Sequence, residues 1–281
     1  MVRLLATLVI ARLTLREAAS RKILWAALIL GVAFLVLYGV GVYFIQREIV
    51  REGTLPGYTR EMYNFLAMAG LYVVNFLVVM MTVLTSVDTL AGEISSGTVQ
   101  AVVTKPLRRS EIVLGKGVGF ATMLALYVAL MAGGVAAIMA ALTGYSVPGL
   151  ARGLMLMTLE GLTLLSMCLL GGATFSTLAN GVLAFGLYGL AFIGGWIEQI
   201  GSLLRNEAAV NIGIVSSLLM PSEALWKRAA FEMQSPLSRE LGSMTPFSST
   251  SVPNERMTLY AVVYIAVMLA LALRQFSRRD L

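Results

Sequence analysis

The sequence predicts an all-α integral membrane protein with six transmembrane helices. Of its 281 residues, 58% are hydrophobic and only 13% are charged, which leaves too little polar surface for a soluble protein of this length. Long stretches without any charged residue match the roughly 20 residues that a helix needs to cross a bilayer. The basic residues gather at the termini and in one loop, which is typical of an oriented membrane protein.

The uncharged runs give the number of spans. The run 161–197 is long enough for two helices, and we expect a tight turn at Ala179-Asn180-Gly181 between them. The run 117–151 fits one span followed by a turn-rich stretch. The predicted spans, all within one transmembrane domain over residues 1–281, are about 23–45, 64–87, 117–142, 153–178, 181–197 and 257–274.

The N-terminal residues 3–22 are predicted to form an amphipathic helix lying in the membrane interface. Arg12 and Arg16 stand four residues apart and would face the lipid headgroups, with Leu and Ala on the remaining surface. A cleavable signal peptide is not expected, because the following apolar run is too long and no small-residue cleavage signature is present. The alternative is a basic juxtamembrane tail.

The distribution of Lys and Arg predicts the orientation. Six spans place both termini and the loop 88–116 on one side, and these segments hold twelve basic residues. The short loops on the other side hold four, so both termini are expected in the cytoplasm and the protein in the cell membrane. The net charge of +6 then reflects contact with anionic lipids and gives no sign of nucleic-acid binding.

Residue types needed for catalysis are missing. The chain has no histidine, which excludes His-based triads and His-ligated metal sites. Gly115-Lys116 is followed by glycine rather than Ser or Thr, so it is not a Walker A loop. We therefore expect no enzyme activity, no cofactor and no metal in this chain itself, so energy for any work must come from a gradient or a partner.

The polar segment between the second and third spans carries the main functional prediction. Gly97 should end the preceding helix, Thr98 can cap a short helix over 99–104, and Pro106 ends that helix. Val99, Val102 and Val103 would lie on one face of it. The result is a short amphipathic helix at the cytoplasmic membrane surface, flanked by acid and base.

This segment resembles the signature of type 2 ABC transporter permeases. The matching residues are Glu93, Gly97, Thr98, Val102, Pro106, Arg109, Ile112, Gly115 and Lys116. Six spans, a basic N-terminal helix and a larger outer segment before the last span agree with the same family. The alternative is an ordinary solvated loop with a chance match.

The resemblance implies a permease that exports a substrate with a separate ABC ATP-binding subunit. Two permeases would pair, as a homo- or heterodimer, and each short cytoplasmic helix would act as a coupling helix docked on the ATPase. We call residues 93–109 the coupling segment. Its expected ATPase contacts are Glu93, Gly97, Thr98, Val99, Val102, Val103, Pro106, Arg108 and Arg109. The rival functions are a gradient-driven carrier or channel and a non-transporting membrane scaffold.

The outer segment 198–256 is harder to interpret. Ser222 is expected to cap a helix over 223–232, with Trp226 and Phe231 at the membrane interface. Residues 235–254 are predicted to form a loop. The family resemblance implies an outer cap or a partly re-entrant piece over the exit path, and a plain extracytoplasmic loop is the alternative.

Two polar residues within the predicted spans are candidates for a transport pathway. Glu160 is expected at the outer boundary of its span with a structural role, and a pathway role is the alternative. Asn75 is expected to make a hydrogen bond between helices, and a substrate contact is again the alternative.

Overall fold

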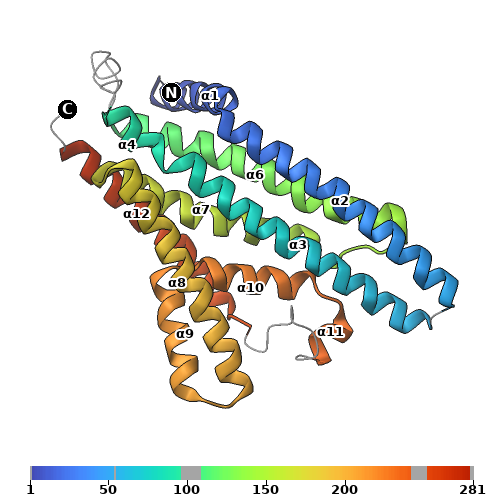
Figure 1. The fold of residues 1–281 in the computed structure, drawn as a ribbon. Coiled ribbons are helices and arrows are strands. Elements are labelled where there is room, and N and C mark those ends of the chain that lie inside the picture. The colour runs from blue at the N-terminus through green and yellow to red at the C-terminus, as the bar shows by residue number, and fades with distance from the viewer. Residues whose placement is uncertain (1, 54, 96–108, 242–251, 279–281) are drawn as a thin grey trace.

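A computed structural model of the chain describes residues 2–53, 55–95, 109–241 and 252–278. Every regular element in these ranges is a helix, and the long helices form one bundle (Figure 1). The helices are α1 (Val2–Ser20), α2 (Lys22–Glu52), α3 (Pro56–Ser86), α4 (Asp88–Ser95), α6 (Arg109–Thr143), α7 (Leu150–Thr174), α8 (Thr177–Leu203), α9 (Glu207–Leu219), α10 (Ser222–Met233), α11 (Pro236–Leu241) and α12 (Glu255–Arg278).

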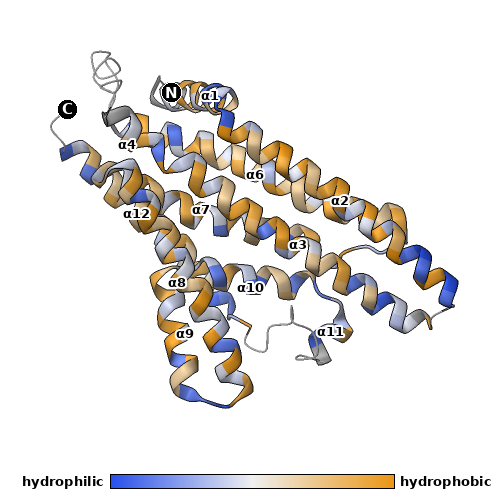
Figure 2. Cartoon of the chain, in the orientation of Figure 1, coloured by the Kyte–Doolittle hydropathy of each residue, from blue (hydrophilic) through white to orange (hydrophobic). Residues whose placement is uncertain are grey.

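Six helices in the described ranges are long and apolar enough to cross a membrane: α2, α3 continuing into α4, α6, α7, α8 and α12. They confirm the predicted all-α membrane fold. The pair α9–α10 is bent by 104° and would add a seventh if it crossed as one broken span. Hydrophobic residues dominate the middle of the bundle, while hydrophilic residues gather at the far end of α2 and at the α8–α9 turn (Figure 2).

The centre of the bundle is built from α3, α6 and α7. Leu71, Met131 and Met157 from these helices are fully buried. In contrast, α2, α8 and α12 leave many large apolar side chains exposed, among them Leu37 and Val182. Contiguous exposed apolar surface marks contact with lipid or with another protein, so these three helices form the outer wall of the bundle.

The turn between the fourth and fifth spans lies earlier than predicted. α7 ends at Thr174 and α8 begins at Thr177, so the predicted turn Ala179-Asn180-Gly181 falls inside α8. Ser176 caps α8 by accepting a hydrogen bond from the Ala179 amide at 3.4 Å. Asn180 reads as a turn residue in the sequence, but its buried side chain pairs with other helices and stabilises the helical conformation instead.

The outer segment is mostly helical. α8 and α9 form an antiparallel hairpin, and α10 crosses from it toward the α6–α7 turn (Figure 1). Trp226 is 1% exposed and packs edge-to-face on Tyr72 at 4.9 Å, so the interfacial position predicted for it is wrong. The predicted helix 223–232 is confirmed as α10. However, Pro221 is its N-cap residue and the Ser222 side chain makes no capping bond. The short helix α11 lies in the predicted loop 235–254, of which residues 242–251 are outside the described part.

The two ends of the bundle differ in their elements. α1, α4 and the C-terminal end of α12 lie together at one end (Figure 1). A chain that crosses the membrane an even number of times begins and ends on the same side, which agrees with this arrangement. The end of α4 and the start of α6 lie at the same end of the bundle.

Candidate functional site

Asp88, the first residue of α4, is held by two other helices where the coupling segment joins the bundle. Its carboxylate accepts a hydrogen bond from Thr177 Oγ1 on α8 at 2.8 Å. The Arg21 guanidinium lies 3.5 Å from the same carboxylate and 2.6 Å from Glu17 of α1. A carboxylate in the first turn also interacts favourably with the helix dipole. Asp88 thus ties α4 to α8 and, through Arg21, to the junction of α1 and α2.

Two further side chains fix the backbone around α4. Asn180 Nδ2 donates to the carbonyl of Val87 at 3.0 Å and to that of Cys168 at 2.9 Å, so it joins α3 and α7 to α8. Lys116 on α6 is 5% exposed and donates to the carbonyl of Thr89 at 3.2 Å. Buried bonds of this kind restrain the relative positions of the helices they connect. Hydrogen bonds thus connect α4 and the residue before it to α6 and α8, and Asn180 connects α8 to α7.

Helix α1 packs directly on the start of α6. A Cβ at Gly115 would lie 2.6 Å from Ile10, and a Cβ at Gly119 would lie 2.9 Å from Thr14. Glycines four residues apart therefore allow close approach of the two helices. Arg12 on α1 is exposed, and so are the apolar side chains of Leu8 and Leu13. Whether this exposed surface meets the membrane remains a prediction.

Most of the predicted ATPase contacts lie outside the described residues. These are Gly97, Thr98, Val99, Val102, Val103, Pro106 and Arg108. Glu93 lies in α4 and Arg109 begins α6, so the two ends of the coupling segment are the part that the structure describes. The contact itself stays a prediction. Sequence reasoning missed the anchoring roles of Asp88, Lys116 and Asn180. Asp88 and Lys116 stand at the ends of apolar runs, which is a signal, whereas Asn180 lies inside such a run.

The bundle interior holds a buried carboxylate. Glu160 lies within α7 with 0% exposure, and Asn75 Nδ2 on α3 donates to its Oε1 at 3.2 Å. The expected position of Glu160 at the outer boundary of its span is therefore wrong, because α7 begins ten residues earlier, at Leu150. The hydrogen bond expected between Asn75 and another helix is confirmed. The pathway role of both residues stays untested.

A buried ion pair joins α10 to α8. Lys227 Nζ lies 3.0 Å from Glu198 Oε2 and donates to the carbonyl of Gly195 at 2.9 Å. Both charged side chains are at most 10% exposed. Glu223, one turn earlier on α10, is also buried. The second half of the bent pair is thus connected to α8 by a buried charge pair.

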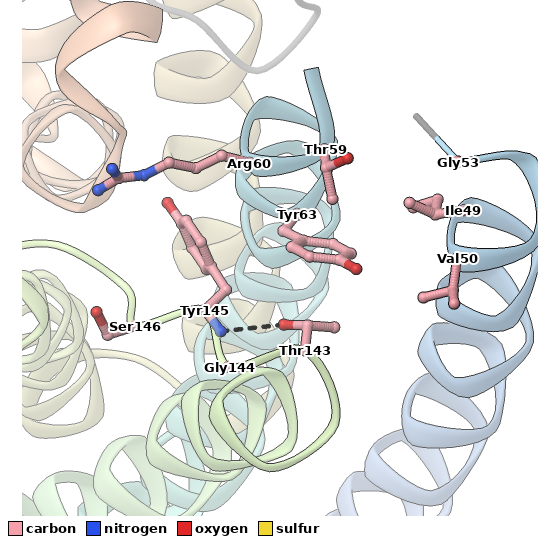
Figure 3. Close-up of a pocket in the computed structure, with 10 residues that line it drawn as sticks. All are labelled: Ile49, Val50, Gly53, Thr59, Arg60, Tyr63, Thr143, Gly144, Tyr145 and Ser146. Carbon is pink, nitrogen blue, oxygen red and sulfur yellow. Dashed lines mark hydrogen bonds between the residues drawn. The ribbon is translucent and has the colours of Figure 1, made fainter. Parts of the chain in front are cut away.

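At the end opposite α4, a cleft of about 530 Å³ opens between α2, α3 and the α6–α7 turn (Figure 3). Tyr63 points from α3 toward α2, whereas Arg60 points to the other side. Burial raises the pKa of Tyr145 to about 12, so its hydroxyl stays protonated and donates to Asn64 Oδ1 at 3.0 Å. The described residues that line this cleft include no carboxylate, so these residues offer hydrogen bonding without an acid–base pair.

The comparison with protein families decides the identity of the chain. A family model described as "ABC-2 family transporter protein" matches residues 8–281. The chain belongs to the ABC-2 transporter family. Its resemblance to type 2 ABC permeases is thereby confirmed over nearly the whole length, and no curated protein matches it.

Membership fixes the coarse function. An ABC-2 protein of this kind is the multi-pass membrane permease of a transporter, and such permeases are not themselves ATPases. Within the described ranges, no three His, Cys, Asp or Glu side chains come together in a way that could hold a metal ion. The polar groups of this ABC-2 permease instead connect helices, among them the helices that the coupling segment joins.

Proposed function

We propose that this ABC-2 permease exports a substrate across the cell membrane, driven by a separate ABC ATP-binding subunit that docks on the coupling segment. The anchoring of α4 carries this proposal. A movement driven by ATP in a soluble subunit can reach the spans only through an element fixed to them. Asp88, Lys116 and Asn180 provide that fixation on three sides.

The proposed transmission runs from the coupling segment into α4 and α6. Displacement of α4 pulls on α8 through Thr177 and on the junction of α1 and α2 through Arg21. Displacement of α6 moves α1 with it, because Gly115 and Gly119 hold the two helices in direct contact. The displacement of α8 reaches α7, because Asn180 on α8 donates to the Cys168 carbonyl on α7. Helices α1, α6, α7 and α8 therefore respond to the segment.

The orientation and the dimer belong to the same proposal. Both termini and the coupling segment face the cytoplasm, which is supported by the twelve basic residues on that side against four in the opposite short loops. A second permease subunit, of the same or another chain, covers part of the apolar wall formed by α2, α8 and α12, and lipid covers the rest.

The alternative function, that of a gradient-driven carrier, is supported by one observation. Carriers place ionisable groups near the middle of the membrane, and this protein buries Glu160 and the Glu198–Lys227 pair between its helices. A carrier would transport without any bound ATPase. Dependence on ATP hydrolysis therefore separates the two functions.

The proposal is tested by isolating the tagged full-length chain from membranes of its own cells and assaying ATP hydrolysis in the eluate. We expect a bound ATP-binding subunit and vanadate-sensitive hydrolysis. Arg108→Ala with Arg109→Ala should weaken this association, and more strongly at high salt, since dissolved ions screen charges at the edge of a protein–protein contact. Arg47→Ala with Arg51→Ala, at exposed positions of the opposite end, is the matched control. A functional transporter isolated without any ATPase would contradict the proposal.

A further inference from the structure

The pair formed by Glu160 and Asn75 leaves two acceptor atoms without a partner. Asn75 Nδ2 donates to Glu160 Oε1, which uses one oxygen of the carboxyl group and the amide nitrogen. The remaining polar atoms of the same two groups, Glu160 Oε2 and Asn75 Oδ1, are buried and make no hydrogen bond to any described residue. Unpaired buried acceptors are rare in folded proteins and call for a physical explanation.

Among the described residues, no basic side chain is found to pair with Glu160. The ammonium group of Lys227 on α10 is used by Glu198 and the Gly195 carbonyl. On α7 itself, Thr163 Oγ1 donates to the Glu160 backbone carbonyl and not to its carboxyl group. On α6, Leu124 packs against the neighbouring Gly161.

The other titratable groups around Glu160 are a carboxyl group and phenols. Glu223 on α10 lies close enough for its charge to act on Glu160. Tyr72 on α3 and Tyr188 on α8 complete the surroundings. On α12, the Tyr264 hydroxyl is directed to the sulfur of Met220. An ionised Glu160 would therefore face a second acid and only one amide donor, in the interior of a membrane protein, where an unpaired charge is costly.

A single proton would give both unpaired atoms a hydrogen-bond partner. A proton on Oε2 converts the carboxyl group into an O–H donor, and Asn75 Oδ1 is the free acceptor on the amide that already donates to Oε1. A carboxylic acid and a primary amide can pair in this reciprocal way through two hydrogen bonds. We propose that Glu160 and Asn75 form a proton-binding site, a reciprocal acid–amide pair that joins α3 to α7 and releases its proton to water when these helices part.

The site links the packing of the bundle to pH. Because the packed state holds a proton that the parted state gives up, acidic conditions favour the packed state and rising pH weakens it. Nothing in this inference requires an ATPase, so it can fail while the proposed function stands, and the reverse is also true.

Infrared spectroscopy of the full-length chain in detergent tests the site. At neutral pH we expect a carboxylic-acid C=O band that shifts in D2O and is absent from Glu160→Gln. The substituted glutamine can still pair with Asn75 through two hydrogen bonds, so this variant should fold. Glu223→Gln is the matched control and should retain the band. A wild-type spectrum without a protonated carboxyl group at neutral pH would overturn the proposal, as would loss of the band in Glu223→Gln alone.

Thermal unfolding gives an independent readout. The melting temperature of the wild type should fall as the pH rises above the ordinary glutamate pKa, whereas that of Glu160→Gln should lack this component. In Asn75→Leu, the carboxylic-acid band should persist at a shifted frequency because its hydrogen-bond partner is gone. Identical pH dependence in the wild type and Glu160→Gln would contradict a proton held by Glu160.

Discussion

At the scale of single residues, Asn180 combines a buried position with bonds to two other helices. Its amide nitrogen donates to carbonyls on α3 and α7 while the residue itself belongs to α8. We expect Asn180→Ala to lower the free energy of unfolding by about 2 kcal/mol, because two buried carbonyls lose a donor. Thermal unfolding in detergent measures this, with the exposed Asn211→Ala on α9 as the control. Equal stability of the two variants would show that Asn180 is not a structural link.

Three residues that the structure places differently from the sequence prediction share one cause. The sequence predicts Asn180 in a turn, Trp226 at the interface and Glu160 at a span boundary. Each assignment follows the average behaviour of its residue type. In the structure, each side chain is buried against a distant part of the chain: Asn180 on Val87, Trp226 on Tyr72, and Glu160 on Asn75. Local sequence carries no information about such tertiary partners.

At the scale of elements, the bent pair α9–α10 depends on the ion pair between Lys227 and Glu198. Lys227→Met leaves a buried carboxylate without its partner, and we expect a loss of about 3–5 kcal/mol in unfolding free energy. Adding Glu198→Gln should recover much of that loss, since no unpaired charge then remains. A double-mutant cycle by chemical unfolding measures the coupling. Additive effects of the two substitutions would contradict a direct pair.

The spans were the most predictable elements, because roughly 20 consecutive apolar residues have few other uses in a protein. α2, α6 and α12 each cover their predicted run and extend beyond it. The contacts that position the coupling segment were not predictable. Asp88 and Thr177, which are 89 residues apart in sequence, meet only once α4 and α8 have packed. The segment's own contacts lie outside the described residues and stay predictions.

At the scale of the whole molecule, the first testable property is its orientation. In a Cys168→Ala background, single cysteines at Thr54 and Ser248 should react with an impermeant reagent applied from outside. Cysteines at Ser96 and Ser277 should react only after the membrane is opened. This pattern follows from six spans with the basic segments in the cytoplasm. Labelling of Ser96 from outside would reverse the assigned orientation.

The association of the permease with its ATPase depends, in this account, on the apolar face of the coupling segment. Val102 and Val103 are expected to enter a groove of the ATP-binding subunit. Replacing both with Asp would drive unpaired charges into that contact. Leu203→Asp with Leu204→Asp is a matched control, because these exposed leucines lie at the α8–α9 turn, away from α4.

The most direct test compares the ATP hydrolysis that co-purifies with the tagged wild-type chain, the Val102→Asp, Val103→Asp variant and the Leu203→Asp, Leu204→Asp control. We predict that bound ATPase falls roughly tenfold or more in the valine variant, since burying an unpaired charge costs several kcal/mol. The leucine control should hold the ATPase as the wild type does. A valine variant that inserts normally and still retains wild-type amounts of ATPase would contradict the coupling role of this segment.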